Sequence, residues 1–218
     1  MTAAVGGTPT RRGVWRPAVL GGVLALLMAV GLLVVAGIGG PDVARGASTP
    51  GDSSPEAGFC RDMSIHHQQA VEMSFLVRDA TDDEAVRRLA YDIINTQANQ
   101  RGMMLGWLDA WDLPVGSSRP YMEWMGHAHT PTVDGPLMPG MATDAEVRAL
   151  AAAEGEQAEI LYLQMMLEHH RSGVTMAEAI VERTDQDDVE RLAQTMVNGQ
   201  TSEINLIEGM LEERGVTG

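Results

Sequence analysis

The segments MSIHHQQAVEM (residues 63–73) and MLEHHRSGVTM (residues 166–176) decide the fold, because they are one motif written twice. When residues 63–108 are aligned with residues 166–211 without gaps, at an offset of 103, 15 of the 46 positions are identical. Each copy continues into a second stretch in which apolar residues recur at spacings of three and four, as in an amphipathic helix. The chain therefore contains an internal repeat of a helical hairpin.

Two such hairpins can bury their apolar stripes against each other, which predicts an all-α protein built as a four-helix bundle. The composition agrees, because aromatic residues make up only 4% of the chain while helix-forming Ala, Leu, Met, Glu and Arg are abundant. We expect the four helices at about residues 57–79, 83–111, 156–183 and 186–214.

The bundle is expected to span residues 57–215, with one hairpin in residues 57–112 and the other in residues 156–215. A connector over residues 113–142 joins them, and a loop of that length is usually functional or disordered. After the connector, Thr143 and Glu146 have the spacing of a capping box, which predicts one further helical stretch.

The first 56 residues have the pattern of a membrane-targeting segment followed by a tether. Residues 18–38 form an uncharged apolar run of 21 residues, about the length of a transmembrane helix. We expect an uncleaved anchor, with a cleaved signal segment and a secreted product as the alternative. The positive-inside rule keeps the Arg-containing residues 1–17 in the cytoplasm and places the bundle outside the cell, tethered by the Gly-, Pro- and Ser-rich residues 39–56.

The charge of the chain excludes a nucleic-acid partner. All 15 basic residues are Arg, and from Asp42 onward 12 Arg stand against 30 Asp and Glu, a formal balance of −18. A surface of this sign repels polyanions. A single cysteine, Cys60, also excludes an intramolecular disulfide and any Cys-x-x-Cys site.

Imidazole and thioether groups share one face of the first helix in each hairpin, because the motif spacing places them within a narrow arc. One interpretation is that these Met fill the core and that these His are structural. The repetition of both doublets at equivalent positions favours a metal site instead. The candidate ligands are Met63, His66, His67, Met73, Met166, His169, His170 and Met176.

Polar residues interrupt the apolar stripe of the second helix in each hairpin: Gln97 and Gln100 in the first, Gln200 and Glu203 in the second. Buried amides and carboxylates need partners. We expect these four side chains to bond the neighbouring His and fix their orientation, as groups behind metal ligands commonly do.

Thioether and imidazole ligands favour copper, particularly Cu(I). Iron is the alternative, in a metal-oxidising bundle in which Glu72, Glu168 and Glu203 would join the His, but the Glu-x-x-His motifs of di-iron bundles are missing. Cys60, one turn before Met63, could add a ligand or be an inert buried thiol. The connector could form a second, looser copper site or a plain flexible loop; its candidates are Met122, Met125, His127, His129, Met138 and Met141.

The stretches FCRDMSIHHQQAVEMS and YLQMMLEHHRSGVTMAEA resemble the signature of the bacterial family known as domain of unknown function 305, over about residues 57–215. The downstream Gln97 and Gln200 and the connector sequence MPGM are similar to the two-copy version of that family. The resemblance implies a ferritin-like four-helix bundle, exported or membrane-anchored, and some Met- and His-rich members bind copper. Carried over by position, it implies the same eight ligands.

Together these patterns predict an exported, membrane-anchored protein that buffers copper or hands it on, and no enzyme activity is required. The partners expected are a metal ion, the membrane through residues 18–38, and a second copy of the chain or a copper-transfer partner. A metal-oxidising enzyme and a purely structural or partner-binding bundle are the competing hypotheses.

Overall fold

Local sequence signals set where three of the helices begin in the computed structural model, which describes residues 48–216. Helix α2 (Pro55–Ala80) starts behind Ser54, whose hydroxyl accepts a hydrogen bond from the amide of Ala57. Helix α3 (Glu84–Ala110) starts behind Asp83, whose carboxylate accepts from the amide of Val86. Both are N-caps that satisfy amides at an exposed helix end.

The second hairpin is entered through a short helix, α4 (Asp144–Ala152), which opens with the predicted capping box of Thr143 and Glu146. Gly155, at a φ of +56°, then turns the chain into α5 (Gly155–Val181). Helix α6 (Asp187–Glu213) completes the hairpin. The regular elements of residues 48–216 are therefore all helices, with no strand, and the predicted all-α class is confirmed for this part of the chain.

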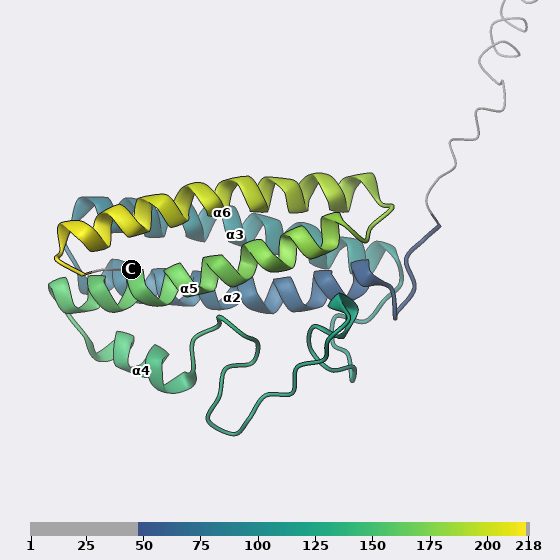
Figure 1. Ribbon diagram of the computed structural model, residues 1–218, viewed down its shortest axis with the longest axis horizontal. Helices are drawn as coiled ribbons and strands as arrows, with labels where there is room; N and C mark the ends of the chain where they lie inside the picture. Colours follow the sequence, from purple (N-terminus) through teal and green to yellow (C-terminus); the bar gives the residue numbers. More distant parts are fainter. Residues whose placement is uncertain (1–47, 217–218) are drawn as a thin grey trace, which may run out of the picture. The chain divides into compact units, whose positions relative to one another are not determined.

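Two antiparallel hairpins make up the bundle (Figure 1). Helix α2 packs along α3, and α5 packs along α6, while contact between the hairpins is made mainly by α2 against α5. The connector carries one short 3-10 turn, η1 (Glu123–Met125), and crosses beneath α2 and α5 in the view of Figure 1. Helix α4 packs against the same two helices.

The core consists of two buried clusters, one at each end of the bundle. The connector-side cluster contains the start of α2, the end of α5 and the buried residues of the connector. The α4-side cluster contains the end of α2, the start of α5 and Leu150 of α4. Because α2 and α5 run antiparallel, their His doublets lie between the two clusters.

The anchor predicted at residues 18–38 lies outside the described residues. Among the helices of residues 48–216, none combines the length and the apolar character needed to cross a bilayer.

Candidate metal centre

The first histidine of each doublet faces the other hairpin. His66 of α2 and His169 of α5 are fully buried, and their rings lie against each other in a tilted arrangement, with centroids 3.6 Å apart and planes inclined by 32°. Their equivalent positions in the repeat place them opposite each other where the two antiparallel helices meet. The two doublets are therefore joined into one layer of four imidazoles.

The second histidine of each doublet turns towards the second helix of its own hairpin, because consecutive helical residues point about 100° apart. Nε2 of His67 lies 2.8 Å from Oε1 of Gln100 on α3. Nε2 of His170 lies 2.6 Å from Oε2 of Glu203 on α6. The structure thus brings Gln100 and Glu203 to the imidazoles, as the sequence predicts.

Burial keeps the imidazoles of His66, His67 and His169 in their neutral form. It lowers the pKa of His66 and of His169 well below the ordinary value of 6.5, and the neighbouring imidazoles lower both further. Burial also lowers the pKa of His67 to about 4, although its hydrogen bond to Gln100 acts in the opposite direction. A neutral imidazole retains one nitrogen lone pair, which is the form that binds metal ions.

Buried polar atoms without partners gather in this layer. Within residues 48–216, neither ring nitrogen of His66 or His169 has a hydrogen-bond partner, and the same holds for Nδ1 of His67 and of His170. The amide groups of Gln97 and Gln200, which are 2% and 4% exposed, are also unpartnered, so the expectation that these two side chains would bond the neighbouring His is wrong. Such groups are costly to bury, so their concentration here indicates donor atoms available to a bound ligand.

Gly173 of α5 lies against the imidazole layer. A Cβ at this position would collide with Oε1 of Gln200 and would lie 3.2 Å from Cε1 of His66. The equivalent position in the first hairpin is Ala70, so the repeat alone does not reveal this close approach. Gly173 therefore allows the Gln200 amide to lie beside the His66 ring.

Thioether groups flank the imidazole layer on both sides. Met63 and Met176 are fully buried in the connector-side cluster, and Met73 and Met166 are fully buried in the α4-side cluster. Each pair combines one methionine from α2 with one from α5. The methionines of one sequence motif are therefore divided between the two ends, and each end draws on both hairpins.

The connector delivers its methionines to the core. Met122, Met125, Met138 and Met141 are all buried in the connector-side cluster, which contains eight buried methionines in total. His127 is exposed, and the half-buried His129 is held by a hydrogen bond from its amide to the carbonyl of Tyr121. The six connector candidates thus do not form one group.

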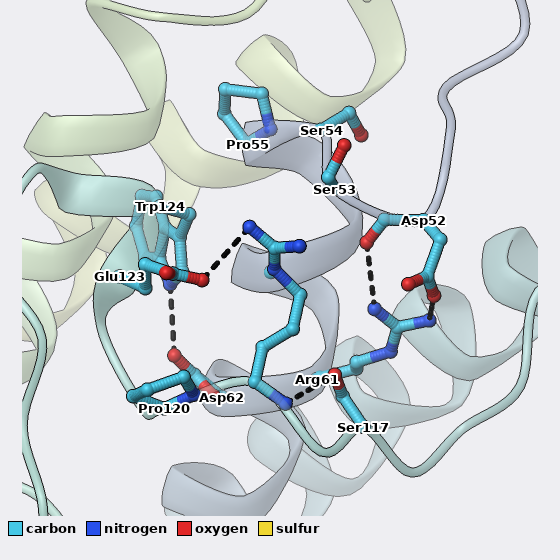
Figure 2. A pocket seen from close by; sticks show the side chains of 12 residues that line it. Asp52, Ser53, Ser54, Pro55, Arg61, Asp62, Ser117, Pro120, Glu123 and Trp124 are labelled. Carbon is cyan, nitrogen blue, oxygen red and sulfur yellow. Dashed lines mark hydrogen bonds and ion pairs between the residues drawn. The ribbon is translucent and has the colours of Figure 1, made fainter.

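Asp62 fastens the connector to α2, a role that the sequence patterns did not reveal. Its Oδ2 accepts hydrogen bonds from the amide of Met122 at 2.8 Å and from Nε1 of Trp124 at 2.9 Å. Figure 2 shows the second of these bonds at the wall of a pocket of about 240 Å³ beside the start of α2. Arg61 in the same wall is held by Asp52 and by the carbonyl of Pro114, and none of the predicted metal ligands lines this pocket.

The remaining candidates fit less well. Cys60 is fully buried in the connector-side cluster, and burial strongly raises the pKa of its thiol, so it stays protonated. Glu72 is exposed, and Glu168 is exposed and paired with Arg171, so Glu203 is the member of that trio that contacts a histidine. Among residues 48–216, no three His, Cys, Asp or Glu side chains are grouped closely enough to hold a metal ion by themselves.

Residues 48–216 therefore form an all-α bundle whose core holds a layer of four buried imidazoles between two pairs of thioethers. The chain belongs to the family described as domain of unknown function (DUF305), which it matches over residues 56–211. This confirms the family resemblance noted in the sequence. No curated protein matches the chain.

Solved structures of the same fold agree with this assignment. A DUF305 protein of Streptomyces coelicolor, described as a candidate secreted protein, is 59% identical, with 77% of this chain and 98% of that chain covered and a TM-score of 0.71. A DUF305 fragment of Deinococcus radiodurans is 32% identical, with 75% and 99% covered and a TM-score of 0.63.

The protein CopM, in its Cu(I)-bound form, is 21% identical, with 73% of this chain and 96% of that chain covered and a TM-score of 0.55. CopM structures in Cu(II)-bound, Ag-bound and apo forms match as well. At this level of identity the similarity concerns the fold.

Proposed function

We propose that the protein is an exported, membrane-anchored copper-binding protein that buffers Cu(I) or hands it on through the imidazole layer and its flanking methionines. The observation that carries the proposal is the layer itself: four fully buried histidines with unpartnered ring nitrogens, between the pairs Met63/Met176 and Met73/Met166. Buried nitrogens without hydrogen-bond partners lower the stability of a core that has only a structural role. A bound metal ion would give these nitrogens a partner.

Cu(I) fits these donors better than harder ions do. Thioether groups are soft donors that favour Cu(I), and imidazole also suits copper, whereas Mg²⁺, Ca²⁺ and Mn²⁺ prefer carboxylate and carbonyl oxygen. Glu203 is the carboxylate that contacts a histidine here, so a carboxylate-rich iron centre is not supported. The choice of copper is supported by CopM, a protein of the same fold that was crystallised with Cu(I), Cu(II) and Ag.

Export is proposed from the apolar run at residues 18–38 and its Arg-rich flank. The description of the Streptomyces coelicolor relative supports an extracytoplasmic location. An acidic surface with a balance of −18 from Asp42 onward is compatible with the attraction of cations.

The test is an anaerobic titration of the purified full chain with Cu(I) in competition with a chromophoric Cu(I) chelator. We expect the wild type to withdraw Cu(I) from the chelator. The variant that combines His66→Leu, His67→Leu, His169→Leu and His170→Leu should lose this ability and keep its helical circular dichroism. Leu fills the volume of each ring without its nitrogens. A control with His127→Ala and His129→Ala, both in the connector, should bind as the wild type does.

The methionines allow a second arm with a matched control. Met63→Leu with Met176→Leu removes the thioethers next to the imidazole layer and nearly conserves volume. Met104→Leu with Met196→Leu removes two thioethers from the same connector-side cluster outside the predicted ligand set. We expect weaker Cu(I) binding only in the first pair. Cu(I) binding that survives the replacement of all four histidines would refute the proposed site. If the wild type does not take Cu(I) from the chelator, the hypothesis of a structural bundle remains.

A further inference from the structure

Gln100 and Glu203 are one equivalent pair of positions at which the two halves of the imidazole layer differ in charge. Gln100 and Glu203 are separated by the repeat offset of 103 residues, and each contacts Nε2 of the second histidine of its own hairpin. The first contact is neutral, at 2.8 Å, and the second is made by a carboxyl group, at 2.6 Å. The metal-binding motif itself is the same in both halves, so this difference distinguishes them.

The carboxylate fixes the proton on the His170 ring. A carboxylate can only accept, so Nε2 of His170 must carry the hydrogen and donate it to Glu203. When the ring is neutral, the lone pair of His170 is then on Nδ1, which is buried and has no partner within residues 48–216. Gln100 can present either its oxygen or its amide hydrogens to His67, so the proton position on that ring is not fixed in the same way.

The same carboxylate favours a cation in its own half. A positive ion taken into a buried layer loses its hydration, and nearby negative charge offsets part of that cost. Glu203 supplies such a charge directly behind the ring of His170. The basic residue next to His170 in the chain, Arg171, is exposed and paired with Glu168 and Glu208 on the outer surface. The first half has the neutral Gln100 at the equivalent position.

We propose that Glu203 is a positioning residue that makes the second-hairpin half of the layer the tighter site and the first to load, with Nδ1 of His170 as the atom presented to the ion. The first-hairpin half, at His67, then binds a second ion more weakly. This inference rests on the proposed binding of Cu(I), and it adds an order of loading to it.

The experiment compares three single variants of the full chain. Glu203→Gln makes the second half resemble the first, and Gln100→Glu makes the first half resemble the second. Glu212→Gln removes one exposed carboxylate from the same helix, α6, away from the layer, and controls for net charge. The readouts are Cu(I) affinity by chelator competition and the ¹⁵N spectrum of the histidine rings, with and without Cu(I).

In the wild type we expect two affinities, and we expect the first equivalent of Cu(I) to shift Nδ1 of His170 while His67 stays unchanged. Glu203→Gln should weaken the tighter affinity by about 10- to 100-fold, the usual effect of removing the partner of a metal-bound histidine. Gln100→Glu should strengthen the weaker one. Before any metal is added, the His170 ring should show a single form with the hydrogen on Nε2.

The outcomes separate this inference from the proposed function. Two equal affinities that do not respond to Glu203→Gln would overturn the order of loading and leave Cu(I) binding in place. A wild type that binds no Cu(I) would overturn both. If Glu203→Gln fails to fold, the wild-type ¹⁵N titration and the Gln100→Glu variant decide, because a first shift at His67 would contradict the proposal.

Discussion

At the scale of the residue, the buried histidines tie stability to pH. His66, His67 and His169 have pKa values lowered by burial, so in the folded protein they stay neutral where the unfolded chain, with an ordinary value of 6.5, takes up protons. As the pH falls below 6.5, the free energy of unfolding of the metal-free protein must therefore fall. The loss approaches about 1.4 kcal/mol per pH unit for each of these histidines, and for His67 it levels off near pH 4.

Urea unfolding of the metal-free protein at about pH 7 and about pH 5 measures this slope. We expect the variant with Leu at positions 66 and 169 to depend less on pH, because two of the three titrating groups are gone. Asp62, whose pKa is raised by burial, acts in the opposite direction in both proteins, so the comparison isolates the histidines. Equal slopes in the two proteins would show that the rings are not held neutral.

The sequence predicted the doublets as the candidate site, because they recur with the same neighbours. It predicted the contacts of Gln100 and Glu203 with the second histidines, but the contacts expected of Gln97 and Gln200 are not formed. It did not predict that the ring of His66 would lie against that of His169. That contact depends on the angle and register at which α2 meets α5, which are properties of packing between hairpins. The equivalent of Asp62 is Met165, so the repeat also held no sign of the bond that anchors the connector.

At the scale of the element, each interhelical turn is tied to the opposite hairpin. Thr81, between α2 and α3, donates to Glu159 at the start of α5, and Thr184, between α5 and α6, donates to Glu56 at the start of α2 at 2.8 Å. Both pairs obey the offset of 103 residues, and each Thr hydroxyl also accepts an amide of its own turn. The two contacts hold the ends of the bundle together.

The two contacts differ in one respect that yields a prediction. Glu159 is also paired with Arg214, whereas within residues 48–216 Glu56 has Thr184 as its hydrogen-bond partner. Replacing a hydroxyl that bonds a buried carboxylate costs about 1–3 kcal/mol. We expect Thr184→Val to lower the free energy of unfolding more than Thr81→Val, because only the former leaves its carboxylate alone. Denaturant unfolding of both variants tests this, and a larger loss in Thr81→Val would contradict it.

Sequence patterns predicted the helices but not the structure of the connector. Periodicity and caps predicted the four long helices to within a few residues, and the capping box predicted α4. The Pro- and Gly-rich sequence of the connector has no periodicity, so the sequence is compatible with either a looser copper site or a flexible loop at residues 113–142. Its four methionines are buried because they fill the connector-side cluster, a property of the assembled bundle that a local pattern does not encode.

At the scale of the whole molecule, the two ends of the bundle differ at an equivalent pair of positions, and at one end the two side chains are hydrogen-bonded to each other. The hydroxyl groups of Tyr162 and Ser74 form a buried hydrogen bond of 2.9 Å that joins α5 to α2 in the α4-side cluster. The equivalent positions are Phe59 and Ala177, both fully buried in the connector-side cluster. Both hydroxyl groups are present at one end of the bundle and both are absent at the other. This is expected if each buried hydroxyl needs the other as its hydrogen-bond partner.

This pairing predicts the outcome of a double-mutant cycle. Tyr162→Phe and Ser74→Ala should each lower the free energy of unfolding by about 1–3 kcal/mol, because each leaves a buried hydroxyl without its partner. The double variant recreates the Phe and Ala pair of the other end, so its loss should be smaller than the sum of the two single losses by about 0.5–3 kcal/mol. Denaturant unfolding of the wild type and the three variants provides the four free energies. Strict additivity would mean that the two hydroxyls are satisfied independently, and that the difference between the two ends does not reflect a shared requirement of the pair.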